Sequence, residues 1–350
     1  ITMVTIGVIG CGKIAQVRHL PEYADNNNCK ITALFDINKE RAEELAVKYG
    51  AKAYDSIEAI LADKTIDAVS ICTSNATHAS ITIDALNAGK DVLCEKPMAI
   101  TLEECEAMVE AAKKNGKKLM IGQNQRLAKA HEVAKELVES GKLGKVLTFR
   151  TAFGHGGPET WSVDPGKNTW FFDKKRAAMG AMADLGIHKT DLIQYLVGSK
   201  VVSTQAVLTT LDKKGADDQL IGVDDNAICI YTMANGTIGT MTASWTYYGQ
   251  EDNSTILYCT NGILRLYDNP EHTVQWIHAD GTIENIEADA IQTNDNQTKS
   301  GIIDLFLECL VEDKEPEISG ADVLSAMRAV FASIKSSETG QKVDIEANRG

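Results

Sequence analysis

The segment Thr5-Ile6-Gly7-Val8-Ile9-Gly10-Cys11-Gly12-Lys13-Ile14-Ala15 decides the fold class of this 350-residue chain. It runs from an apolar, strand-like stretch through the pattern Gly-x-Gly-x-x-Ala into a helical pattern. In a βαβ unit the first glycine permits a tight turn, the second lets a pyrophosphate approach the backbone, and the small third residue allows close helix–strand packing. The helix N-terminus then presents its N–H groups to the anion. The segment therefore predicts a dinucleotide-binding turn formed by Gly10, Gly12, Lys13 and Ile14.

The first third of the chain alternates short apolar runs with helical patterns, which is typical of parallel strands joined by crossover helices. The predicted strands occupy 4–9, 30–35, 68–72, 91–94 and 118–121. The predicted helices follow Lys13, Asn38, Ser56, Thr77 and Thr101. Thr77 and Thr101 are expected to cap their helices, and Glu104 completes a capping box with Thr101. This stretch predicts a Rossmann-type domain over 1–124.

The pattern changes after residue 124. A helix at 128–140 and a strand at 145–153 precede a Gly/Pro/aromatic loop over 154–178, and a second helix follows at 180–197. Hairpin-like strands with Asn-Gly and Asp-Gly turns come next, at 201–211, 226–233, 237–247, 255–259, 263–267 and 274–277. Helices at 295–311 and 321–338 follow these strands. The sequence therefore predicts a second, β-rich domain over 125–350, in which the long irregular loop is a candidate for function.

Composition excludes several classes of protein. The net charge of -14 argues against nucleic acid or an anionic membrane as partner, because both attract basic surfaces. No run of 18 apolar residues and no signal-peptide pattern occurs, so we expect a soluble, cytoplasmic protein. The eight cysteines lack both C-x-x-C pairs and zinc-finger spacing, which predicts core thiols and no metal site.

Polar residues follow three of the predicted strands, at the edge where ligands bind in open α/β sheets. Asp36 ends the second strand, where an acid is expected to bind the adenosine ribose hydroxyls. Ile37 comes next instead of an arginine, so NAD is favoured over NADP, although the nearby Arg41 leaves NADP open. Further cofactor contacts are expected from residues after the third and fourth strands, namely Thr73, Ser74, Asn75, His78, Glu95 and Lys96.

Lys96 is also a candidate for chemistry. It lies between Glu95 and Pro97, which can hold a lysine rigidly at the cofactor edge for proton transfer or carbonyl polarisation. In the helix at 180–197, Asp184 and His188 are spaced i, i+4, and the carboxylate can position the imidazole for proton transfer. A metal site is rejected here, since no further ligand has suitable spacing.

Three motifs in this order resemble the glucose-fructose oxidoreductase / inositol dehydrogenase / rhizopine-catabolism (Gfo/Idh/MocA) family. They are Gly10-Cys11-Gly12-Lys13-Ile14-Ala15 with His19 and Pro21, then Glu95-Lys96-Pro97, then Asp184-x-x-x-His188-x-x-Asp191. The resemblance covers nearly the whole chain. It implies an α/β protein with an N-terminal Rossmann dinucleotide-binding domain and a C-terminal α+β domain that has a large, mostly antiparallel open sheet. One sheet face would line the active site, and the other would form a homodimer or homotetramer.

The resemblance also implies residue roles. Lys96 and His188 would be the catalytic pair, with His188 as general acid/base, and Asp184 would orient the histidine and bind substrate. The Lys96–Pro97 bond is expected to be cis. Relatives commonly open this helix with a Gly-Gly pair, whereas this chain has Met179-Gly180-Ala181-Met182, which leaves the pocket shape and the substrate open.

Other residues are weaker candidates for binding substrate: Arg126, His155, Trp170 and Tyr247. Aromatic faces beside hydroxyl and imidazole groups suit a polyol ring, but they equally suit an ordinary sheet or a subunit interface.

The sequence and the resemblance together predict an NAD-dependent oxidoreductase that passes a hydride from a ring hydroxyl carbon of a cyclic polyol or sugar to the nicotinamide. Two alternatives remain. One is an NAD-dependent glycosidase that oxidises its substrate transiently. The other is a non-catalytic NAD-sensing regulator, which is expected to lack the Lys/His pair that this chain retains.

Overall fold

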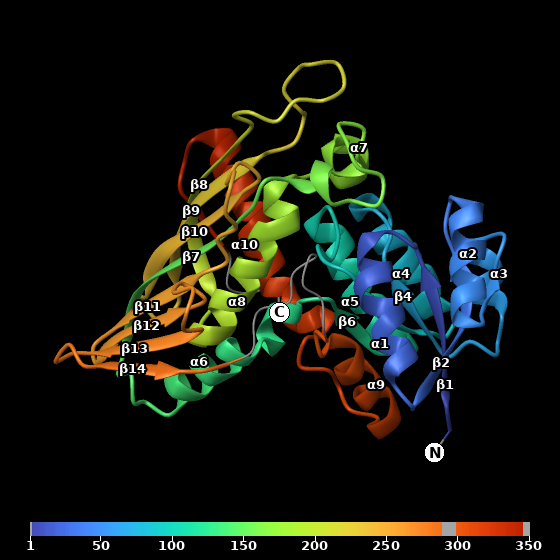
Figure 1. Ribbon diagram of the computed structural model, residues 1–350, viewed down its shortest axis with the longest axis horizontal. Helices are drawn as coiled ribbons and strands as arrows, with labels where there is room; N and C mark the ends of the chain where they lie inside the picture. Colours follow the sequence, from blue (N-terminus) through green and yellow to red (C-terminus); the bar gives the residue numbers. More distant parts are fainter. Residues whose placement is uncertain (1, 289–298, 346–350) are drawn as a thin grey trace. The chain divides into compact units, whose positions relative to one another are not determined.

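The computed structural model describes residues 2–288 and 299–345 (Figure 1). The described chain forms two compact units. The first contains the residues up to Asn124, the short segment Trp161–Val163 and the described part of Gln292–Leu324, and the second contains the rest. The boundary after Asn124 coincides with the predicted one, but the second unit is not the continuous stretch 125–350.

The first unit is built on a parallel sheet with the order β3-β2-β1-β4-β5-β6 in the described residues. Its strands are β1 (Val4–Ile9), β2 (Cys29–Phe35), β3 (Lys52–Ala53), β4 (Ala68–Ile71), β5 (Asp91–Cys94) and β6 (Leu119–Ile121). The predicted Rossmann-type arrangement is confirmed, and the two-residue strand β3 is the only one of the six without a predicted counterpart.

Helices join these strands. They are α1 (Leu20–Asp25), α2 (Lys39–Tyr49), α3 (Ile57–Ala62), α4 (His78–Asn87) and α5 (Leu102–Asn115). A later helix, α9 (Ile302–Glu312), belongs to the same unit. The predicted cap at Thr101 is confirmed, because its hydroxyl accepts from the N–H of Glu104 at 3.1 Å. The predicted cap at Thr77 is wrong: this residue has helical backbone angles and its hydroxyl donates to Ser74 O at 2.9 Å.

The helix predicted over 295–311 begins later than expected. Residues 295–298 lie outside the described residues, and α9 begins at Ile302. Gly301 has φ +84°, and the Glu22 carboxylate accepts from the N–H and the hydroxyl of Ser300. These contacts fix the turn that precedes the helix.

The second unit contains a sheet with the order β14-β13-β12-β11-β7-β10-β9-β8-β15. Its strands are β7 (Val146–Gly154), β8 (Val201–Thr209), β9 (Asn226–Met233), β10 (Ile238–Ser244), β11 (Thr255–Cys259), β12 (Gly262–Leu266), β13 (Val274–His278), β14 (Ile283–Ile286) and β15 (Val343–Asp344). Only β7 and β10 pair in parallel within the described part of this sheet, so the mostly antiparallel sheet is confirmed.

Side chains alternate between the two faces of this sheet. On β9, Ala227, Cys229 and Tyr231 are buried, whereas Ile228 and Ile230 are exposed. The remaining helices are α6 (Lys129–Glu139), the short α7 (Lys174–Ala177), α8 (Ile187–Val197) and α10 (Gly320–Thr339). α8 lies along one face of the sheet (Figure 1).

Candidate active site

The turn after β1 has the geometry expected of a dinucleotide-binding turn. Gly10 has φ +93°, and a Cβ there would lie 2.6 Å from the backbone carbonyl of Cys72 at the end of β4. A Cβ at Gly12 would meet only Val163, at 3.9 Å. Gly10 is therefore required for the close approach of the two strand ends, while Gly12 leaves open space beside the backbone.

Asp36 joins the ends of β1 and β2. Its carboxylate accepts from Cys11 N at 2.7 Å and from Asn38 N at 2.8 Å. Arg41 Nη1 lies 3.9 Å from the same carboxylate, and Ile37 is exposed. A cation therefore lies beside the acid at this strand end, and two backbone N–H groups fix the Asp36 carboxylate.

The residues after β4 form a hydrogen-bonded loop. The Thr73 and Thr77 hydroxyl oxygens lie 2.7 Å apart, and Asn75 is buried. The buried ring of His78 lies between two carbonyls, with Nδ1 2.6 Å from Pro97 O and Nε2 2.9 Å from Thr73 O. Burial lowers the pKa of His78. The ring therefore lies between two loops of the unit, and the cofactor contact of His78 stays a prediction.

Glu95 is buried directly before Lys96, and the Lys96–Pro97 peptide is cis, as the resemblance implied. Glu95 Oε1 lies 2.7 Å from His19 Nε2, and Oε2 accepts from Lys96 N at 3.2 Å. Burial alone would raise the pKa of Glu95, but the hydrogen bond and charge of His19, with the charges of Arg18 and Lys96, lower it to about 2. Glu95 is an ionised internal carboxylate, and it holds the backbone of Lys96.

In the second unit, Asp184 lies in a π-helical turn, Met182–Gly186, and His188 lies in the first turn of α8. The predicted regular helix over 180–197 is thus interrupted, because π-turns bond i to i+5 and widen the repeat. The Asp224 carboxylate accepts from the N–H groups of Gly180 and Met182, at 2.9 and 2.8 Å. A Cβ at Gly180 would lie 1.9 Å from Asp224 O, so this start of the helix requires a glycine.

Several predicted residues gather around Asp184. Its Oδ2 accepts from Trp245 Nε1 at 3.0 Å and lies 3.8 Å from His155 Nε2. The rings of His155 and His188 both pack against Phe153, with centroids 6.1 and 5.9 Å away. The structure therefore brings a carboxylate and two imidazoles together at the end of β7.

Tyr247 and Trp170 lie in the same unit. The Tyr247 ring covers Gly154, since a Cβ at Gly154 would lie 2.1 Å from its Cδ2. Trp170 stacks on Phe171 with centroids 3.9 Å apart, and the next residue, Phe172, packs on Trp245. Tyr247 is therefore adjacent to His155 in the fold, while Trp170 connects to the cluster through Phe172.

Arg126 forms a buried ion pair with Asp191. Its Nε and Nη2 donate to the two oxygens of Asp191 at 2.8 and 2.6 Å, and its guanidinium lies over the Tyr195 ring. A bidentate pair of this kind fixes both side chains. Arg126 and Asp191 thus tie the segment before α6 to α8, and substrate binding by Arg126 stays a prediction.

Sequence reasoning missed Lys189, which directly follows His188. Its side chain is 0% exposed, and Nζ lies 3.2 Å from Asn253 O and 3.5 Å from Thr255 Oγ1. Burial lowers the pKa of Lys189 to about 7. Nearly every residue of α8 is buried, so this helix has no exposed face. The spacing of its apolar residues therefore gave no signal that Lys189 is buried.

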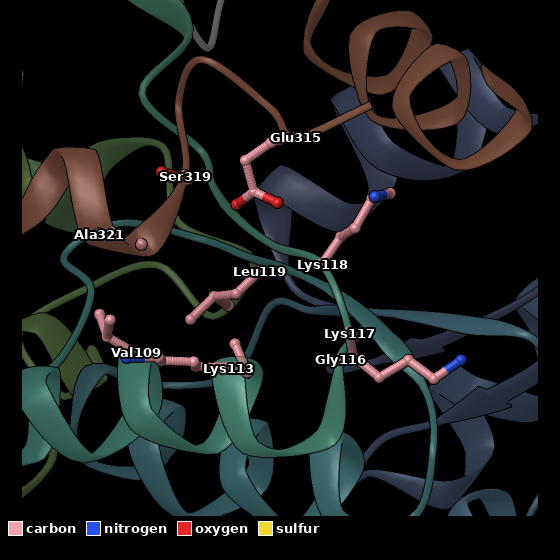
Figure 2. A pocket seen from close by; sticks show the side chains of 11 residues that line it. Val109, Lys113, Gly116, Lys117, Lys118, Leu119, Glu315, Ser319 and Ala321 are labelled. Atoms are coloured by element: carbon pink, nitrogen blue, oxygen red, sulfur yellow. The ribbon is translucent and has the colours of Figure 1, made fainter. Parts of the chain in front are cut away.

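A pocket of about 390 Å³ in the first unit lies away from these residues (Figure 2). It is lined by the end of α5, the start of β6 and residues 315–321. The pocket lies at the amino end of β6, whereas the Gly10–Gly12 turn follows the carboxyl end of β1. Because the strands of this sheet are parallel, these are opposite ends of the sheet. Figure 2 shows Glu315 on one side of it and Val109 and Lys113 of α5 on the other. This pocket is therefore not part of the predicted cofactor site.

Across 2–288 and 299–345, no cluster of three or more His, Cys, Asp or Glu side chains could hold a metal ion. No helix within those ranges is long and apolar enough to span a bilayer.

Comparison with known proteins identifies similar chains. Residues 4–123 match the model of an oxidoreductase family with an NAD-binding Rossmann fold, and residues 131–265 match the GFO/IDH/MocA C-terminal domain. Levoglucosan dehydrogenase of Pseudarthrobacter phenanthrenivorans is 34% identical over 65% of this chain and 63% of its own length. Myo-inositol 2-dehydrogenase of Thermotoga maritima is 26% identical over 97% of this chain and 98% of its own length.

A solved structure of levoglucosan dehydrogenase in complex with NADH and L-sorbose superposes with a TM-score of 0.86 at 25% identity, covering 99% of this chain and 100% of that one. The sequence alignment with levoglucosan dehydrogenase, by contrast, spans less than two thirds of that protein. The sequence alignments with the two named dehydrogenases thus cover different shares of this chain, 65% and 97%.

Proposed function

This chain belongs to the GFO/IDH/MocA family of oxidoreductases, and from that premise we propose that it is an NAD-dependent dehydrogenase acting on a ring hydroxyl of a cyclic polyol or sugar. The observation that carries the proposal is the Gly10–Gly12 turn with Asp36 fixed at its side, because this arrangement suits a dinucleotide. The substrate class is supported by relatives named for levoglucosan and myo-inositol.

The residues of the first unit fit the cofactor. Gly10, Gly12, Lys13 and Ile14 would hold the pyrophosphate at the helix N-terminus, and Asp36 with Ile37 would bind the adenosine ribose. The rest of the dinucleotide would contact residues at the carboxyl ends of β4 and β5, where ligands bind in open parallel sheets. These residues are Thr73, Ser74, Asn75 and Lys96. We propose NAD rather than NADP, because the Asp36 carboxylate would repel a 2′-phosphate. When bound, NAD supplies the acceptor for the substrate's hydride.

The second unit would bind the substrate. Asp184, oriented by Trp245, would accept hydrogen bonds from ring hydroxyls, and His155 and Tyr247 would line the same site. His188 would take the hydroxyl proton as general base, with Lys96 sharing the proton path. In this scheme the substrate loses one proton to the protein and one hydride to the cofactor, and becomes a ketone.

We also propose a cytoplasmic homodimer or homotetramer formed through the exposed face of the second unit's sheet. Val207 on β8 is paired with Ile228 on β9, and both are exposed, as are Ile230 and Ile238. An apolar patch of this kind is typical of a subunit interface. The eight free cysteines suit a reducing compartment. Sedimentation equilibrium of the full chain tests the assembly, and a monomer at micromolar concentration would contradict it.

The experiment that tests the activity is an NADH-absorbance screen. The candidate substrates are inositol isomers, aldoses, deoxy- and anhydro-sugars and sugar acids, each with NAD and with NADP. We expect NADH formation with at least one polyol or sugar. Product formation without net NADH would favour the transient-oxidation glycosidase, and cofactor binding without turnover would favour the regulator.

A further inference from the structure

Glu95 occupies a closed position in the first unit. The residue is 4% exposed, and both carboxylate oxygens are engaged: Oε1 with His19 Nε2 at 2.7 Å and Oε2 with Lys96 N at 3.2 Å. A Cβ at Gly122 would lie 2.9 Å from Oε2, so the backbone after β6 closes against the carboxylate. The carboxylate therefore has little freedom to move. The Lys96 N–H group, which donates to it, is restrained as well.

The second ring nitrogen of His19 also has a hydrogen-bond partner. Its Nδ1 lies 2.9 Å from Ser70 Oγ, which lies 2.6 Å from Tyr23 OH, and all three side chains are buried. The network runs from the α1 region through β4 to the end of β5. Because Tyr23 is buried, the network ends inside the unit and suits support better than proton transfer to solvent.

The residue after Lys96 is restrained by a separate contact with His78. His78 Nδ1 lies 2.6 Å from Pro97 O, and its Nε2 lies 2.9 Å from Thr73 O. The short segment that carries Lys96 is thus fixed at the N–H of Lys96 by Glu95 and at the carbonyl of Pro97 by His78.

We propose that Glu95 is a positioning residue for Lys96: a buried carboxylate, fixed by His19, that sets the backbone from which the Lys96 side chain reaches the reacting hydroxyl. Glu95 was expected from the sequence to contact the cofactor, and this inference gives it a different role. The inference rests on the proposed function for the part played by Lys96, but the restraint on the Lys96 amide does not depend on any activity.

A carboxylate suits this position better than an amide. Glu95 accepts at both oxygens, one from Lys96 N–H and one from the imidazole of His19 in the tautomer that carries its proton on Nε2. In Glu95→Gln the side chain has one acceptor oxygen, so it can accept from Lys96 N–H only if its amide N–H faces His19 Nε2. That contact is a hydrogen bond only when the His19 proton moves to Nδ1, and in either case the negative charge 4.0 Å from Arg18 Nη1 is lost. We expect the loop to shift as these contacts change, and a displacement of about 1 Å at a reacting group can lower the rate by about 10²-fold.

The test compares Glu95→Gln with Glu22→Gln in the full chain. Glu22 is a matched control, because it is also 4% exposed, lies in the same unit, and accepts from the N–H and hydroxyl of Ser300. For Glu95→Gln we expect kcat to fall by about 10²-fold while the Kd for NAD stays within about twofold of wild type. Glu22→Gln should lose stability but keep kcat. Glu95→Asp, which retains the charge but shortens the reach to Lys96 N, should also lose kcat and is the second variant if the amide fails to fold.

Hydrogen exchange at the Lys96 amide is a readout that needs no substrate. We expect faster exchange of this N–H by about tenfold or more in Glu95→Gln, and no change in Glu22→Gln. Unchanged exchange, or a kcat within about threefold of wild type, would overturn the inference, and so would a Kd for NAD weakened by about tenfold, which would make Glu95 a cofactor residue. If wild type shows no turnover, the proposed function fails and the exchange result still decides the role of Glu95. If Lys96→Ala loses turnover and Glu95→Gln does not, only the present inference fails.

Discussion

Replacing the buried Lys189, which follows the proposed base, should raise the free energy of unfolding above that of wild type. This gain should be larger near pH 6 than near pH 9. Burial lowers the pKa of Lys189 from 10.5 to about 7. Below about pH 7 the folded and unfolded chains both hold this proton, and the folded state bears the full cost of the buried charge. Between about 7 and 10.5 the unfolded chain holds the proton and the folded chain does not, so the free energy of unfolding rises with pH.

The size of the effect follows from the same values. The difference between 10.5 and about 7, at about 1.4 kcal/mol per pH unit, sets an upper limit of about 5 kcal/mol. Lys189→Met removes this cost, but it also removes the hydrogen bonds to Asn253 O and Thr255 Oγ1, which offset about 1–3 kcal/mol. We therefore expect Lys189→Met to be more stable than wild type by about 2–4 kcal/mol near pH 6.

Urea unfolding at several pH values measures this difference. Subtracting wild type from Lys189→Met cancels the other titrating groups, and the remaining difference should shrink by about 2–3 kcal/mol between about pH 6 and pH 9. Lys200→Met, at an exposed lysine, is the control and should give a flat difference. A flat difference for Lys189→Met as well, or a variant less stable than wild type near pH 6, would refute the reasoning.

Three further predictions concern the site. Asp36→Ser should weaken NAD relative to NADP in calorimetric titrations, and an unmoved ratio would show that Asp36 does not read the ribose. Lys96→Ala should fold and bind NAD but lose about two to four decades of turnover, so near-normal turnover would remove its proposed role. Turnover in the oxidation direction should rise with pH as the His188 imidazole loses its proton, which gives a rising limb in the pH–rate profile. His188→Ala should abolish this limb. Asp184→Asn should retain it but bind substrate more weakly. An unchanged limb in His188→Ala would transfer the base role to another residue, most simply Lys96.

Local patterns in the sequence predicted much of the cofactor edge. The Gly10-x-Gly12 turn and Asp36 are recognisable because their roles depend on backbone constraints within one βαβ unit. The Thr101 cap was predictable for the same reason, since its partner lies three residues away. The alternating patterns of the second unit likewise predicted most of its strands, although β14 and β15 had no distinct signal.

Partners that are distant in the sequence were not predictable. Arg126 pairs with Asp191 across 65 positions, and His19 pairs with Glu95 across 76. A single sequence shows that these residues are polar but not that each satisfies the other in the interior. The sequence therefore predicted ligand contacts for Arg126 and Glu95 and gave no signal of these internal ion pairs. The π-turn at Asp184 was missed because its residues fit a regular helical pattern equally well.

Deuterium transfer tests the central claim most directly. A polyol or sugar found active in the NADH screen is prepared with deuterium on the carbon that bears the reacting hydroxyl, and the dinucleotide is examined by NMR after turnover. The account predicts one deuterium at C4 of the nicotinamide for each ketone formed, because the hydride passes directly from carbon to cofactor. NADH without deuterium, or ketone formed without NADH, would contradict it.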